Sequence, residues 1–300
     1  MQRNLFLTVI TSFLLVQADA QNGDKLNQLK NVPVRTFYSN GGHEQRATGM
    51  AIRIGKAIRY QQQLTGFKPE VTLLVLDAAD WKLYAANPVY GMPHYKGVDS
   101  LVVAAEDNPF WKGFLPPLNQ LPEPLSKQVQ AVYRVEDGTV SMRPFFDLLA
   151  IHELGHAFHF QGGLNIQRLW MGELFCNILL HTYIAENEPE QLPALTLFPK
   201  MIVGAGAKEY TYTRLNDVEE LYEEMGSKHP KNYGWFQCRW HSAAAGIYDT
   251  GGKELFTRLW KALKEQKERL PDALLVDFLE TKVSRSVADV MRNWDKETVQ

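Results

Sequence analysis

The N-terminal half of the chain combines one helical pattern with short apolar runs. Apolar residues recur at helical spacing within residues 44–65, and Gly66 follows them, so we predict a helix that ends at this glycine. The runs 71–77 and 100–105 are short, apolar and partly β-branched, which predicts two buried strands. This mixture of one helix and two strands is typical of an α/β lobe.

Three further segments of this half carry turn-forming residues. Residues 87–97 contain two prolines and two glycines and are predicted to form a loop. Alternating residues on either side of Asp137 and Gly138 predict a hairpin over 130–142. The proline-rich stretch 114–124 indicates a boundary between two lobes.

From Pro144 onward the pattern is almost entirely helical. The order of elements therefore predicts an α+β fold, with an N-terminal α/β lobe at residues 21–143, a helical lobe at residues 144–300 and a cleft between them. The predicted helices of the second lobe cover residues 144–161, 166–185, 215–226, 233–248, 253–268 and 272–294.

The first twenty residues differ from the rest of the chain. One positive charge, Arg3, precedes an apolar stretch from Leu5 to Val16, and Ala18 and Ala20 form an A-x-A ending. This is the pattern of a secretory signal peptide, residues 1–20, that is cleaved after Ala20. The stretch is shorter than the roughly 20 apolar residues of a membrane span. We therefore expect a secreted or periplasmic protein with no membrane span after cleavage.

Composition and charge narrow the range of partners. The chain has 300 residues, 45% of them hydrophobic, and a net charge of −2. No basic run is interleaved with aromatic residues, so nothing favours a nucleic-acid partner. The chain has two cysteines, Cys176 and Cys238, which are either a disulfide pair or two buried thiols.

The strongest chemical signal is the stretch LAIHELGHAF at residues 149–158. A helix advances 100° per residue, so His152 and His156 project from one face, one turn apart, and both imidazoles can reach a single Zn²⁺. Glu153 lies one residue step away, close enough to take a proton from a zinc-bound water as general base. The alternative interpretation is an amphipathic helix that happens to contain histidines.

The third zinc ligand has to come from another part of the chain. His159 shares the face, but a straight helix places it about 10 Å from His152 along the axis. Glu173 is flanked by apolar residues, which indicates an inward carboxylate that needs a partner. That partner is either zinc or a buried cation. Asn177, one turn later, shares the face of Glu173 and is placed to brace a zinc-bound histidine.

This H-E-x-x-H helix, followed by a second helix that carries a glutamate, resembles the gluzincin metallopeptidases. The family includes thermolysin-like enzymes and relatives of aminopeptidase N. The resemblance implies a zincin fold, with a small sheet, the active-site helix beneath it and a helical lobe behind. Asn177 stands where thermolysin-like enzymes often have aspartate, and no G-x-M-E-N motif is found, so this chain is predicted to be a divergent member.

The resemblance also suggests a donor that stabilises the oxyanion. Members similar to aminopeptidase N use a tyrosine near the start of a later helix, a role that falls on Tyr233 here. Thermolysin-like members use a histidine instead, so His229 and His241 are rival candidates. The expected function is that of an exported zinc metallopeptidase, a single catalytic unit acting on peptides or proteins. The alternatives are a non-catalytic metal-binding protein and a zinc hydrolase of a non-peptide amide or ester.

Overall fold

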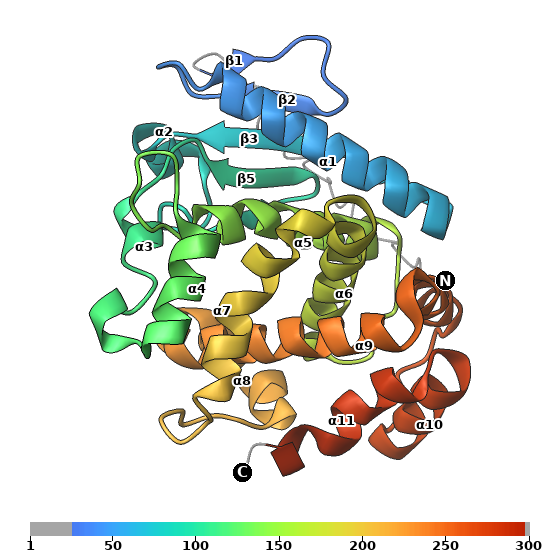
Figure 1. Ribbon diagram of the computed structural model, residues 1–300. Helices are drawn as coiled ribbons and strands as arrows, with labels where there is room; N and C mark the ends of the chain where they lie inside the picture. Colours follow the sequence, from blue (N-terminus) through green and yellow to red (C-terminus); the bar gives the residue numbers. More distant parts are fainter. Residues whose placement is uncertain (1–25, 298–300) are drawn as a thin grey trace, which may run out of the picture.

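The computed structural model describes residues 26–297, which form an α+β fold with a small mixed sheet above a stack of helices (Figure 1). The strand order in the sheet is β1-β2-β3-β5-β4. The three central strands run parallel, whereas β1 and β4 lie antiparallel at the two edges. The strands are β1 (Asn27–Gln28), β2 (Arg35–Tyr38), β3 (Thr72–Leu76), β4 (His94–Lys96) and β5 (Ser100–Ala104).

Helix α1 (Glu44–Thr65) connects the parallel strands β2 and β3 and confirms the helix predicted at the same bounds. Its apolar face is buried, and Gly66 ends it in the left-handed conformation at φ 69°. There the backbone N–H of Gly66 donates to the carbonyl of Gln62, which satisfies one of the last free carbonyls of the helix. The predicted strands at 71–77 and 100–105 are confirmed as β3 and β5.

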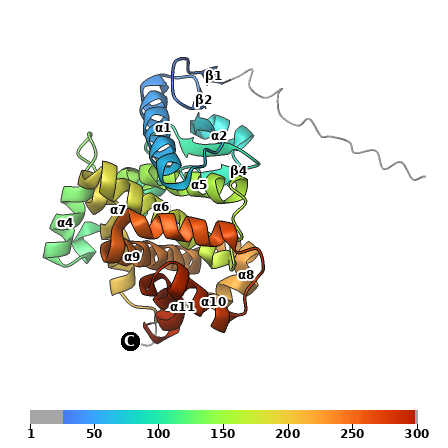
Figure 2. The same cartoon turned by 90° about the vertical axis from the view of Figure 1, so that its right-hand side faces the viewer.

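Two buried helices, α5 and α6, form the centre of the molecule. α5 (Arg143–Gln161) begins with Pro144 in its first turn and packs against β4 and β5. α6 (Leu169–Asn187) packs between α5 and α9 (Pro230–Glu265), and all its residues from 170 to 184 are buried. Figure 2 shows this order from the side, with the sheet above α5 and the helical stack below. A predominantly apolar helix is expected at such a position, and the few polar residues of α6 then need partners inside the protein.

The other helices enclose this centre. α9 breaks at Gly251 and Gly252, the latter with φ 58°, where the sequence predicted a boundary between two helices. The predicted helix 272–294 is also divided, because one helix ends at Lys282 and the next begins at Arg285. The remaining helices are α2 (Ala78–Tyr84), α3 (Pro109–Lys112), α4 (Glu123–Tyr133), α7 (Leu192–Gly204), α8 (Leu215–Lys228), α10 (Asp272–Lys282) and α11 (Arg285–Glu297).

The predicted hairpin over 130–142 is confirmed at its turn, but the strands predicted on either side of the turn do not form. Helix α4 continues to Tyr133, and only a single bridge joins Arg134 to Val140. The hydroxyl of the buried Tyr133 donates to the carbonyl of Ala194 and accepts from the backbone N–H of Phe198. These bonds hold the end of α4 against α7, so tertiary packing overrides the local alternation. The turn itself forms at Gly138, with φ 81°.

Two other predictions needed tertiary information. The predicted loop at 87–97 ends in strand β4, which is stabilised by pairing with β5. Residues 192–204 form α7, which the sequence pattern did not predict because Pro193 and Pro199 interrupt it.

The expected signal peptide at residues 1–20 lies outside the described residues. Among residues 26–297, no helix combines the length and the apolar content that crossing a membrane requires.

Candidate metal centre

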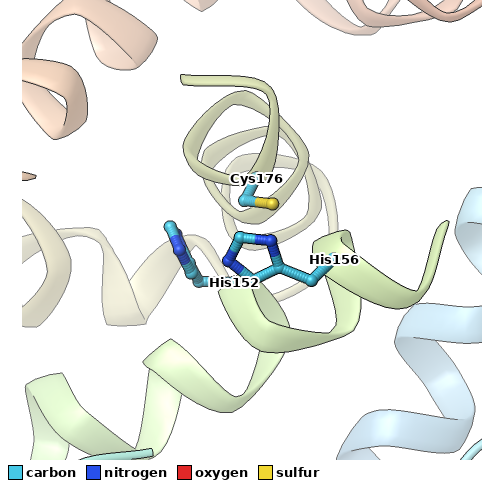
Figure 3. Close-up of side chains that lie close together, drawn as sticks. All are labelled: His152, His156 and Cys176. Atoms are coloured by element: carbon cyan, nitrogen blue, oxygen red, sulfur yellow. The ribbon is translucent and has the colours of Figure 1, made fainter. Parts of the chain in front are cut away.

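Helix α5 presents His152 and His156 to the neighbouring helix α6 (Figure 3). Their ring centroids lie 5.2 Å apart, as expected for one helical turn. Between them, Gly155 faces Cys176 of α6, where an added Cβ would lie only 2.9 Å from the Cys176 Cα. The glycine therefore lets the two helices approach closely at the level of the histidines.

Glu173 reaches both histidines from α6. Its Oε2 lies 3.2 Å from His152 Nε2, and its Oε1 lies 4.0 Å from His156 Nε2. Tetrahedral bonds of 2.0–2.1 Å separate two ligand atoms by roughly 3.3 Å, so the first distance fits a shared zinc ion and the second is somewhat long. Burial alone raises the pKa of a carboxyl group, but the hydrogen bond with His152 and the nearby histidine charges hold the pKa of Glu173 well below its usual range.

Cys176 is a rival for the position of third ligand. One nitrogen of each histidine and the Cys176 sulfur all lie within 4.8 Å of one another (Figure 3). Glu173, in contrast, approaches the two histidines with different oxygens. We favour Glu173 because its carboxylate faces Nε2 of both rings. The Cys176 sulfur packs against Gly155, and burial and the charges of Glu173 and Glu153 raise the thiol pKa well above its ordinary value.

The outer nitrogens of both histidines are held by other side chains. His152 Nδ1 lies 3.1 Å from Asn177 Oδ1, so the predicted bracing contact is present. His156 Nδ1 lies 3.0 Å from Nε2 of His159. The sequence analysis placed His159 too far from His152 to bind the same ion and did not predict this contact. Partners of this kind orient metal-bound histidines and leave Nε2 free for the ion.

The donor set fits a cation between α5 and α6. An amide oxygen can only accept, so His152 Nδ1 must carry the proton that is shared with Asn177. In the neutral ring, Nε2 then has a lone pair that faces the Glu173 carboxylate 3.2 Å away. Two acceptors in contact need a positive charge, either a proton or a metal ion. Burial opposes a charged ring, but Glu173 and Glu153 raise the pKa of His152, whereas burial lowers that of His156 to about 4.

Glu153 lies between the histidines and the sheet. Its Oε2 accepts the backbone N–H of Tyr95, on edge strand β4, at 2.9 Å and lies 4.0 Å from His156 Nε2. Burial raises the pKa of Glu153 to about 7, against the opposing effect of His152. The carboxylate is thus placed next to the candidate ion and can exchange a proton near neutrality.

The structure brings one of the three oxyanion candidates into the hydrogen-bond network of the centre. The Tyr233 hydroxyl accepts from Gln237 Nε2 at 2.9 Å, and the same nitrogen donates to Glu173 Oε2 at 2.7 Å. The ring of His229 instead packs on that of Tyr212, 4.8 Å away. His241 is buried, and its ring lies 6.4 Å from that of His152.

Two residues that the sequence analysis did not identify also contact Glu173. Tyr222, on α8, donates to Glu173 Oε1 at 2.7 Å. Gln237, on α9, donates to Oε2. Both carboxylate oxygens therefore have a donor besides the histidines. Neither residue belongs to a recognisable motif, although Gln237 follows Tyr233 by one helical turn.

The two cysteines are both free and buried, so the disulfide alternative is not the one observed. A groove of about 1290 Å³ runs along α1 and the start of α5, where Arg46 pairs with Asp147. None of the candidate metal ligands lines this groove.

Comparisons with models of known protein families, with curated proteins and with solved structures found no match to this chain.

Proposed function

We propose that this chain is an exported, zinc-dependent metallopeptidase with a zincin-like fold. His152, His156 and Glu173 would hold the metal, Glu153 would act as general base and Tyr233 as oxyanion donor. The observation that carries the proposal is the position of Glu153, which lies 4.0 Å from His156 Nε2 and accepts the backbone N–H of the edge strand β4. The small mixed sheet above α5, with the helical lobe below, is consistent with the zincin arrangement.

The edge strand supports a peptide as substrate. β4 pairs with β5 on one side, and the N–H of Tyr95 points away from β5 toward Glu153. An extended peptide can add to such an edge through its own backbone, and its scissile bond would then lie beside Glu153. Phe160 is 63% exposed and stacks on the Tyr95 ring at 6.2 Å, which offers an apolar surface to a substrate side chain.

When bound, zinc supplies an electrophile for the carbonyl and lowers the pKa of a coordinated water. Glu153 accepts the proton of the attacking water and delivers it to the leaving amine nitrogen. Tyr233 donates its hydroxyl hydrogen to the carbonyl oxygen, on which negative charge develops. Asn177 and His159 keep the histidine rings oriented during these steps.

The test is metal analysis of the purified protein together with digestion of a peptide library. We expect one zinc per chain and cleavage that a chelator abolishes and added zinc restores. Glu153→Gln should retain zinc and fold but lose hydrolysis by about 100-fold or more. Full turnover in this variant would refute the mechanism. Stoichiometric zinc without cleavage of any peptide would favour the non-catalytic alternative or a non-peptide substrate.

A further inference from the structure

Gln237, on α9, faces α6 at the candidate centre. Its Nε2 donates to Glu173 Oε2 at 2.7 Å and to the Tyr233 hydroxyl at 2.9 Å. Its Oε1 accepts from Asn177 Nδ2 at 3.2 Å. The side-chain amide of Gln237 thus bonds to a proposed ligand, to the proposed oxyanion donor and to the residue that orients His152.

The orientation of the Gln237 amide follows from these partners. A carboxylate that is ionised can only accept, so the group facing Glu173 must be the NH₂ and not the oxygen. Rotating the amide by 180° would place its oxygen against Glu173 and its NH₂ against the NH₂ of Asn177. Glu173 therefore fixes the direction of the Gln237 amide.

The orientation of the Gln237 amide also determines which nitrogen of His152 carries a proton. Because Gln237 Oε1 takes a hydrogen from Asn177 Nδ2, the oxygen of Asn177 must face the other way, toward His152 Nδ1. That nitrogen then carries the proton, and Nε2 keeps its lone pair for a metal ion. One glutamine thereby couples the charge on Glu173 to the tautomer of His152.

We propose that Gln237 is a positioning residue that sets the hydrogen-bond direction of the whole centre. The proposal rests on the proposed metal site and goes beyond its ligand set. Gln237 holds Glu173 Oε2 toward His152 and, through Asn177, keeps His152 in the tautomer that binds metal. Gln237 also donates a hydrogen bond to the Tyr233 hydroxyl oxygen, so the hydrogen of that hydroxyl remains available to the substrate.

The test replaces Gln237 with methionine, which has a similar length but cannot donate or accept in the same way. Gln237→Leu repeats the test with a different shape. The control is Ser242→Ala on the same helix, since the Ser242 hydroxyl donates to the Cys238 carbonyl, away from the ligands. Circular dichroism of the metal-free proteins verifies that each variant folds.

Two readouts are independent of catalysis. Competition with a chelator should show Co²⁺ binding to the Gln237 variants about 10- to 100-fold weaker than to wild type, and unchanged in Ser242→Ala. The ¹⁵N shifts of His152 in the metal-free protein, recorded at a pH high enough for the ring to be neutral, should report an Nδ1–H tautomer in wild type and a mixture of tautomers in Gln237→Met.

Folded Gln237 variants that bind Co²⁺ with wild-type affinity and keep the wild-type tautomer would overturn the proposal. The readouts also separate it from the proposed function. A wild-type protein that binds Co²⁺ but cleaves no peptide removes the peptidase assignment. A weaker affinity in Gln237→Met would still support the positioning role in that case. A wild-type protein that binds no Co²⁺ would overturn both.

Discussion

Replacing Gly155 with alanine tests the contact between α5 and α6 on which the candidate centre depends. The new Cβ would lie 2.9 Å from the Cα and the Sγ of Cys176 and 3.0 Å from its Cβ. Carbon atoms in contact prefer about 3.5–4.0 Å. Because one of the opposing atoms belongs to the backbone, the two helices would have to separate by roughly 0.6–1 Å at this point.

The energetic cost follows from this overlap and from helix propensity. Overpacking of a buried contact typically costs about 1–3 kcal/mol. Alanine regains about 1 kcal/mol relative to glycine within a helix. The matched control is Gly246→Ala on α9, where an added Cβ meets nothing within 4 Å. Propensity cancels between the two variants, so we expect Gly155→Ala to be less stable than Gly246→Ala by about 1–3 kcal/mol.

The same displacement should weaken metal binding. Ligand distances in a zinc site tolerate deviations of only about 0.2 Å, and the substitution would increase the separation of His152 from Glu173 by several times that amount. We expect at least about a tenfold loss of zinc affinity, or about 1.4 kcal/mol. Urea unfolding of the metal-free proteins measures the stability difference, and chelator competition measures the affinity. Equal unfolding midpoints for the two alanine variants, with unchanged zinc affinity, would refute the reasoning.

Three further outcomes are expected. Glu173→Gln should weaken zinc binding about 100-fold or more, while Cys176→Ala leaves it nearly unchanged; the opposite result would identify Cys176 as the third ligand. Tyr233→Phe should lower kcat about 100- to 1,000-fold with little change in KM or zinc content, whereas a comparable loss only in His241→Ala would assign the oxyanion to that histidine. Thiol titration of the denatured, non-reduced protein should find both Cys176 and Cys238 free, and finding neither would indicate a bridge.

Elements with a strong local pattern could be predicted from the sequence. The apolar spacing within residues 44–65 and the terminating Gly66 specify α1 without help from the rest of the fold. The apolar runs at β3 and β5 and the Gly-Gly break in α9 are equally local signals. In each case the residues that define the element lie within or directly beside it.

Elements stabilised by distant partners could not be predicted in this way. Strand β4 has three residues and exists because it pairs with β5. The end of α4 is held by Tyr133, whose partners lie more than sixty residues away on α7. α7 tolerates Pro199 within its length. Local propensity carries no information about such contacts.

The candidate centre also combines local features, which could be predicted from the sequence, with tertiary contacts, which could not. Three helices each present two residues one turn apart: His152 and His156 on α5, Glu173 and Asn177 on α6, and Tyr233 and Gln237 on α9. Spacing of this kind is visible in the sequence, because residues four apart share a helix face.

That the three faces meet is a property of the packing. Gln237 donates to Glu173 and Tyr233 and accepts from Asn177. Tyr233 is one turn away on the same helix, but Glu173 and Asn177 lie on another helix. Nothing in the sequence indicates that these two helices meet. The charge of Glu173 depends on this packing. A buried carboxylate without hydrogen-bond donors would be protonated, or its side chain would not be buried. The donors from α8 and α9 therefore maintain the charge that α5 and α6 would offer to a metal ion.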